Sequence, residues 1–268
     1  MLVFSVIIQL NQGWRKRMKT ITIFRSSPRK HGNTNSLTDV VTDIFRKKGC
    51  HVREYDLYEM DIRPCLACRS CQKNWNEVSC IQPDDMQQIF DAVIESELLI
   101  LATPIYSWYC TPPMKAMLDR LVYAMNMYYG EKRGPSLWEG KKVALIVTSG
   151  YPQDKGPDLL EEGIRRYCKH SQLEYTEMLW GRHLGYTEDF MDEEKQRQAV
   201  AFAEKLLAAD RICPCCGQHY FREKGAYEIC PVCGWEDDPL QRKDPDFAGG
   251  ANALSLNEAR KKYHEEAE

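Results

Sequence analysis

The stretch ELLILATPIY at residues 97–106 decides the fold class, and KVALIVTSG at residues 142–150 repeats its character. Both runs are continuously apolar, as expected of strands in a parallel sheet that is covered on both faces. HVREYDLY at residues 51–58 alternates between apolar and polar residues, which predicts an edge strand.

Working outward from these runs, short strand-like segments alternate with helical patterns. We expect strands at 21–24, 51–58, 97–106, 142–150 and 173–180, and helices at 35–48, 84–95, 113–129, 157–171 and 192–209. Five strands alternating with five helices predict an α/β fold with a doubly wound parallel sheet. Ligands bind such sheets at the carboxyl ends of the strands, where the loops 25–35, 103–112 and 148–156 are expected.

The length of 268 residues favours a main domain and a smaller module. The composition turns rich in Cys, Pro and Gly near Arg211, so we expect domains at 18–209 and 211–268. Residues 1–17 are interpreted as an extension or a misassigned start. They carry an apolar run too short to span a bilayer and without the features of a signal peptide, so we expect a cytoplasmic protein without membrane association. The net charge of -3, with mixed signs, argues against nucleic acid.

The loop RSSPRKHGNTNS at residues 25–36 joins a strand to a helix start. Helix N-termini attract anions, and this loop adds the hydroxyls and amides of Ser26, Ser27, Asn33, Thr34 and Asn35. Neither a Walker loop nor a GxGxxG fingerprint is present, which argues against nucleoside triphosphates and dinucleotides. The loop therefore suits a terminal phosphate monoester, and the alternative is an ordinary polar turn.

Two further loops carry aromatic side chains beside expected strand ends. Tyr106, Trp108 and Tyr109 follow one central strand, and Ser149, Gly150 and Tyr151 end the next. Flat aromatic residues beside exposed amides suit a planar heterocycle, and glycine permits close backbone approach. The alternative for these aromatic residues is core packing.

Together SSPRKHGNT, CLACRSC, PDDM and TPIYSWYCTPPMKAMLDR resemble the flavodoxin-like NAD(P)H-dependent FMN reductase family, including its iron-sulfur flavoproteins, over residues 18–208. The resemblance implies strand order 2-1-3-4-5, FMN as cofactor, NADPH or NADH as co-substrate and a homodimer. It implies that the FMN phosphate is held by Ser27, Arg29, Asn33, Thr34 and Asn35. It implies that the flavin ring is lined by Pro104, Ile105, Tyr106, Ser107, Trp108, Ser149, Gly150 and Tyr151. This chain departs from the family in having Arg25-Ser26 where glycine usually precedes Ser-Pro.

The first cysteine group comprises Cys65, Cys68, Cys71 and Cys80. Its compact spacing resembles the run that holds a 4Fe-4S cluster in iron-sulfur flavoproteins, although Cys80 follows after a longer gap than that family shows. Reduced thiols near the flavin, or at a dimer contact, are the alternative. Cys50, Cys110 and Cys168 are isolated and are interpreted as small buried hydrophobic residues.

The second cysteine group has two CPxCG knuckles, Cys213 with Cys216 and Cys230 with Cys233. Two such knuckles predict a tetrahedral site of four thiolates for zinc, or for iron as in rubredoxin. Cys215 lies inside a knuckle and is not expected to be a ligand. Residues 211–264 resemble the cysteine-rich CPCC domain, and Ser255 with Glu258 predicts a capped final helix.

These observations favour an FMN-dependent oxidoreductase that passes hydride or electrons from a nicotinamide to a quinone, azo, nitro or protein acceptor. Because the flavin would carry the chemistry, no catalytic side chain is expected. One alternative is a flavodoxin-like electron carrier without pyridine-nucleotide turnover. Another is a metal-binding adaptor that uses the flavodoxin fold as a scaffold.

Overall fold

The computed structural model describes residues 19–185, 189–208 and 211–267. A five-stranded, all-parallel sheet has the order β2-β1-β3-β4-β5, which confirms the flavodoxin-like topology expected above. The strands are β1 (Thr20–Arg25), β2 (His51–Asp56), β3 (Leu98–Pro104), β4 (Lys142–Ser149) and β5 (Glu174–Arg182). The expected extension, residues 1–17, lies outside the described residues.

The burial of each strand follows its sequence pattern. β3 lies in the middle of the sheet, and all its residues except Pro104 are buried, as its continuous apolar run predicts. Phe24 of β1 pairs in register with Leu101 of β3, and Leu101 pairs with Leu145 of β4. β2 forms an edge and is only partly buried, as expected from its alternation.

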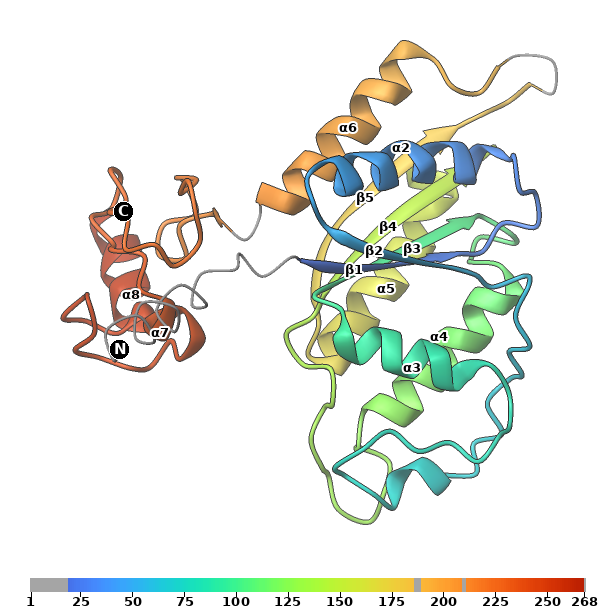
Figure 1. The fold of residues 1–268 in the computed structure, drawn as a ribbon, viewed down its shortest axis with the longest axis horizontal. Coiled ribbons are helices and arrows are strands. Elements are labelled where there is room, and N and C mark those ends of the chain that lie inside the picture. The colour runs from blue at the N-terminus through green and yellow to red at the C-terminus, as the bar shows by residue number, and fades with distance from the viewer. Residues whose placement is uncertain (1–18, 186–188, 209–210, 268) are drawn as a thin grey trace, which may run out of the picture. The chain divides into compact units, whose positions relative to one another are not determined.

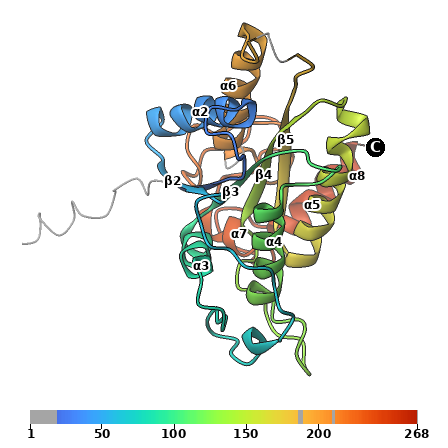
Figure 2. The same ribbon diagram turned by 90° about the vertical axis from the view of Figure 1, so that its right-hand side faces the viewer.

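Helices cover both faces of this sheet (Figures 1 and 2). One face carries α2 (Asn33–Lys47) and the first part of α6 (Glu193–Ala208). The other face carries α3 (Met86–Glu95), α4 (Pro112–Met125) and α5 (Pro157–Ser171). Short 3-10 turns, η1 (Ser70–Gln72) and η2 (Gln153–Lys155), lie in the connecting loops. This doubly wound arrangement leaves the carboxyl ends of the strands free to form a site.

The helix expected at 113–129 ends earlier, at Met125, because the next residue is fixed by tertiary hydrogen bonds. The Asn126 side chain is fully buried and donates to the Ser171 hydroxyl (2.9 Å). Its oxygen accepts from the Ser136 hydroxyl and the Trp138 indole, each at 3.0 Å. Such a satisfied network fixes the chain in a non-helical turn that local sequence does not reveal.

The chain divides into two compact units between Phe202 and Ala203. In the second unit, Phe221, Trp235 and Leu256 pack with the knuckle cysteines into a small core. The unit also contains α7 (Pro239–Lys243) and α8 (Leu256–Ala267). The capping box is confirmed, because Ser255 N–H donates to Glu258 (2.8 Å) and Glu258 N–H donates to the Ser255 hydroxyl (3.3 Å). A domain boundary at 209–212 stays a prediction.

Within the described part of the chain, none of the helices has the length and apolar character needed to cross a membrane.

Candidate functional site

A pocket of about 550 Å³ lies where β1, β3, β4 and β5 end. Its walls come from four loops and are formed by Ser27, Pro28, Arg29, Gly32, Asn33, Thr34, Pro104, Ile105, Tyr106, Thr148, Ser149, Gly150, His183, Leu184 and Gly185. Its volume is in the range of small-molecule and cofactor sites. Ligands of open parallel sheets bind at this edge, next to the carboxyl ends of the strands.

One wall of the pocket is the start of α2. Gly32 is the N-cap residue, and the first N–H groups of a helix have no intrahelical partner. The first turn contains no acidic residue, so its positive end is not neutralised there. A Cβ atom on Gly32 would lie 2.8 Å from Arg29 Cβ and 3.1 Å from Arg29 O, so only glycine fits without moving the loop. This wall is suited to an anionic group.

The polar side chains of this loop divide into two sets. Ser27 and Thr34 line the pocket, and the Thr34 hydroxyl lies 2.7 Å from the hydroxyl of Thr148 on β4. Asn35 does not line the pocket, because its amide donates to the carbonyls of Arg29 (3.1 Å) and Lys30 (3.0 Å). Asn35 therefore stabilises the conformation of the loop.

The cations near the loop also differ in availability. Arg29 lines the pocket and is exposed. Lys30 pairs instead with Glu59, and its hydrogen bond to that carboxylate raises the pKa of Lys30. Arg25 points to Glu54 and Asp39 on neighbouring elements, so it brings no charge into the pocket. Ser26, which directly precedes Ser27-Pro28, is buried and its hydroxyl forms a hydrogen bond with the hydroxyl of Thr111.

The loop after β3 turns tightly. Tyr106 and Tyr109 exchange backbone hydrogen bonds (2.9 and 3.0 Å), and the two residues between them, Ser107 and Trp108, have φ of 48° and 63°. This is the pattern of a hairpin turn that normally requires glycine or asparagine. Non-glycine residues in left-handed conformations are strained, and such strain is concentrated at functional sites.

This turn exposes Trp108 outside the pocket walls. Its ring stacks on Tyr151, with ring centroids 6.0 Å apart and planes inclined by 27°. Both rings are half exposed, at 50% and 55%. Of the aromatic residues expected to line a flavin ring, Tyr106 is therefore part of the pocket wall, whereas Trp108 and Tyr151 form a stacked pair beyond it. Ser107, which precedes Trp108, does not line the pocket either.

The loop after β4 supplies backbone to the pocket. The Ser149 hydroxyl donates to the Tyr151 carbonyl (2.8 Å) and accepts from the Trp180 indole (2.9 Å), so this side chain is used internally. A Cβ atom on Gly150 would meet nothing closer than 3.9 Å, which leaves open space over its backbone. Both residues can contact a ligand through the main chain.

The expected list omitted the segment after β5. His183, Leu184 and Gly185 line the pocket because β5 runs to Arg182, two residues beyond the predicted strand end. Applying the carboxyl-end rule to the fifth strand could have found them. Thr148 also lines the pocket and was not among the expected site residues. Its position next to Ser149, at the carboxyl end of β4, was the signal that could have found it.

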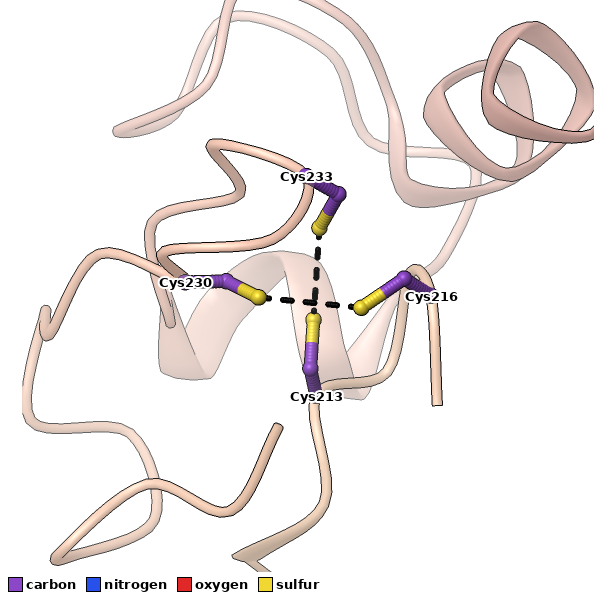
Figure 3. Close-up of side chains that lie close together, drawn as sticks. All are labelled: Cys213, Cys216, Cys230 and Cys233. Carbon is purple, nitrogen blue, oxygen red and sulfur yellow. Dashed lines mark hydrogen bonds between the residues drawn. The ribbon is translucent and has the colours of Figure 1, made fainter. Parts of the chain in front are cut away.

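In the second unit, the four knuckle cysteines converge on one point (Figure 3). Their sulfur atoms all lie within 4.8 Å of one another, with Cys213 to Cys233 and Cys216 to Cys230 both at 3.6 Å. A tetrahedral ion with sulfur bonds of 2.3 Å has ligand edges of about 3.8 Å. The arrangement therefore fits a single ion such as zinc or iron.

The two knuckles are built alike. Gly217 N–H donates to Cys213 O (3.0 Å), and Gly234 N–H donates to Cys230 O (2.9 Å). Both glycines have a positive φ, of 69° and 72°. Burial raises the pKa of the Cys233 thiol, and a bound cation would favour its thiolate form.

Cys215 lies in the small core and is not part of the group, as expected.

The first cysteine group lines a cavity of its own. Cys65, Cys68, Cys71 and Cys80 all contribute to its wall, together with Arg69 and Arg120 and without any Asp or Glu. The sulfurs are not gathered as tightly as in the second group, which among the described residues is the one set that fits a single ion. In a 4Fe-4S cluster each thiolate binds a different iron, so its four ligand sulfurs lie further apart than those around a single ion.

Two family models match the chain. The model described as NADPH-dependent FMN reductase matches residues 18–156, and the model described as Cysteine-rich CPCC matches residues 211–266. An iron-sulfur flavoprotein of Methanocaldococcus jannaschii is 31% identical over 189 residues, which cover 68% of this chain and 86% of that protein. An iron-sulfur flavoprotein of Archaeoglobus fulgidus is 32% identical over 137 residues, and the match spans 51% of this chain and only 58% of that protein.

Solved structures share the fold of the larger unit. An NAD(P)H:quinone oxidoreductase from Methanothermobacter marburgensis has a TM-score of 0.54 at 16% identity, with 71% of this chain and 98% of that chain covered. An FMN-dependent NADH-azoreductase from Bacillus anthracis in complex with FMN has a TM-score of 0.53 at 13% identity, covering 70% and 99%. Because the reductase model spans more than half of the sequence and the Methanocaldococcus relative extends over two thirds of it, the chain belongs to the NADPH-dependent FMN reductase family and carries a C-terminal cysteine-rich CPCC domain.

Proposed function

We propose that this protein binds FMN in the carboxyl-end pocket and uses NADPH or NADH to reduce a quinone, azo, nitro or protein acceptor. The observation that carries the proposal is the α2 wall, where Gly32, the first N–H groups of α2 and Ser27 lie around one space. That donor set fits a phosphate monoester. When bound, FMN supplies the hydride and electron transfer.

The residues of this chain bind and orient the cofactor. Ser27, Arg29, Asn33 and Thr34 would hold the phosphate directly, with Asn35 shaping the loop. Pro104, Ile105, Tyr106 and the backbone of 148–150 would line the ring. Trp108 and Tyr151 would form an aromatic surface beside the ring position.

Half-exposed aromatic residues at the mouth of the pocket also support a homodimer in which the second copy covers this mouth. Light scattering would test the homodimer.

The deciding experiment combines binding with turnover. Purified protein is titrated with FMN, and oxidation of NADPH and of NADH is then followed with a soluble quinone as acceptor. We expect stoichiometric FMN and quinone-dependent turnover with at least one nucleotide. Bound FMN without turnover would favour the electron carrier, and failure to take up FMN would favour the metal-binding adaptor.

We further propose a 4Fe-4S cluster at the first cysteine group. The support is a single cavity walled by all four cysteines, two arginines and no carboxylate, which suits a site with four thiolates. The printed names of the two relatives above agree with it. The enclosed volume is about 20 Å³, and a bound cluster would need more space, which an outward shift of the loop with half-buried Cys65 and exposed Cys68 would open. Anaerobic purification should yield about four irons per chain.

For the second group we propose zinc as the resident ion, with Cys213, Cys216, Cys230 and Cys233 as ligands. The support is the closed, four-sulfur geometry with two half-buried and two buried cysteines, which is typical of structural zinc sites. Metal analysis of the purified protein separates zinc from iron.

A further inference from the structure

Arg120 is a buried cation whose contacts all lead to the first cysteine loop. It belongs to α4, yet only 2% of its surface is exposed. One guanidinium nitrogen donates to the Arg63 carbonyl (2.9 Å) and to Asp84 (2.7 Å). The other donates to Asp84 (3.0 Å) and to the sulfur of Cys80 (3.3 Å). One side chain thus fixes the segments before and after the cysteines.

Asp84 holds this guanidinium in a defined orientation. Its side chain is fully buried and accepts two hydrogen bonds from Arg120, and a third from the Arg63 N–H (3.1 Å). Burial by itself would raise the pKa of Asp84, but these donors outweigh it and keep the pKa below its ordinary value. A bidentate pair of this kind has rigid geometry, so the remaining guanidinium contact with Cys80 is directed and does not vary with rotamer.

Packing alone does not explain a charge at this position. A buried ion pair is costly to desolvate, and well-packed apolar residues of similar size often stabilise a protein as well or better. The nitrogen Nε of Arg120 even lacks a hydrogen-bond partner among the described residues. An apolar pair could provide neither the hydrogen bonds to the Arg63 backbone nor the contact to the Cys80 sulfur. The second of these lies at the wall of the cavity that Cys65, Cys68 and Cys71 share.

We propose that Arg120, oriented by Asp84, is the positioning residue of the four-cysteine site. It holds Cys80, the cysteine that the sequence separates from the other three, in place to serve as the fourth ligand of the cluster. The guanidinium also offsets the negative charge that four thiolates bring to a partly buried position. This inference rests on the cluster proposed above.

The test compares four anaerobically purified, reconstituted proteins. They are the wild type, the double variant Asp84→Leu/Arg120→Met, the conservative variant Arg120→Lys, and the control Lys115→Met. Removing both members of the pair avoids leaving an unpaired buried charge. Lys115 lies on the same helix and forms an exposed ion pair with Asp119 (2.6 Å), so it controls for charge removal on α4. The readouts are iron per chain, the rate of iron loss to a chelator, the midpoint potential of the cluster, and FMN content.

We expect the double variant to retain FMN but to lose iron about 10-fold faster. Loss of a group that hydrogen-bonds to a metal ligand typically lowers metal affinity by about 10-fold or more. The cluster potential of the double variant should become more negative, because a neighbouring cation favours the reduced cluster. Arg120→Lys should show intermediate iron loss with a potential near that of the wild type, and Lys115→Met should match the wild type.

Equal iron retention and potential in the wild type and the double variant would overturn the role of Arg120 while leaving the cluster intact. If the double variant fails to fold, as shown by loss of FMN, the Lys variant decides, and wild-type iron loss in it would overturn the proposal. A wild-type protein with FMN but no iron after reconstitution would overturn both the cluster and this inference, without touching the flavin assignment.

Discussion

The hydroxyl oxygens of Thr34 and Thr148 lie 2.7 Å apart, and both side chains are buried. Thr34 belongs to the first turn of α2, and Thr148 lies near the end of β4. Their hydrogen bond ties the proposed phosphate loop to the central sheet. Both residues also line the pocket, so binding and stability are linked there.

Thr34→Val should lower the free energy of unfolding by about 1–3 kcal/mol, because it leaves the buried Thr148 hydroxyl without this partner. FMN affinity should fall as well, because a donor at the pocket wall is lost. Urea unfolding with and without FMN measures both effects.

The double variant Thr34→Val/Thr148→Val serves as the matched control for this bond. Removing both hydroxyls leaves neither unsatisfied, so most of the lost stability should return while FMN binding stays weak. A double variant as unstable as the single one would contradict the pairing.

Gly32→Ala should weaken FMN binding by at least about tenfold, equivalent to roughly 1.4 kcal/mol. The added Cβ would lie 2.8 Å from Arg29 Cβ, so the loop must move and its donors lose alignment. Isothermal titration with FMN measures the change. Asp43→Ala, at an exposed position of the same helix, should bind FMN like the wild type. Unchanged affinity in the glycine variant would place the phosphate elsewhere.

Removing the metal from the second cysteine group should unfold the C-terminal domain. Its core is small, and the binding free energy of a structural zinc, on the order of 10 kcal/mol, is largely folding free energy. Circular dichroism and limited proteolysis with increasing chelator would follow the loss, and the flavin spectrum should barely change.

Substitutions at neighbouring cysteines sharpen this test. Cys213→Ser should abolish metal binding, because Cys213 belongs to the four-sulfur set. Cys215→Ala should retain the metal, because Cys215 packs in the core outside that set. Loss of metal from the Cys215 variant alone would mean that the ligands are misassigned.

Thiol alkylation should separate the isolated cysteines by pH. Burial raises the pKa of both Cys110 and Cys168 to about 12, so at pH 8 only about one molecule in ten thousand carries the thiolate. Their modification in the native protein should therefore be very slow and should accelerate about tenfold for each unit of pH up to about pH 11. Mass-spectrometric mapping measures each site.

Cys50 provides the comparison within the same sample. Burial raises the pKa of Cys50 above the ordinary value. Because Cys50 is only half buried, whereas Cys110 and Cys168 are buried, it should still react faster than the other two. After denaturation all three should react alike. Rapid native labelling of Cys168 would contradict its interpretation as a buried hydrophobic residue.

The sequence by itself determined the sheet, the position of the carboxyl-end pocket and the cysteine knuckles. Continuous apolar runs such as β3 are typical of central strands, because both faces of such a strand are covered. The carboxyl ends of parallel strands share one edge, which placed Ser27, Tyr106 and Gly150 near each other before any coordinates. The CPxCG spacing is equally local, since each knuckle is closed by its own backbone.

Only the tertiary structure decided which polar and aromatic side chains face the pocket. Asn35 turns to carbonyls of its own loop, Ser149 bonds to Trp180, and Trp108 stacks on Tyr151. In the sequence Arg120 is one of several charged residues of an amphipathic helix, and only the structure shows that it forms a buried ion pair with Asp84. The reason is physical: a hydrogen bond or a stack forms only when two groups meet within a few ångströms. For segments dozens of residues apart, that meeting is set by the packing of the whole fold and not by any local pattern.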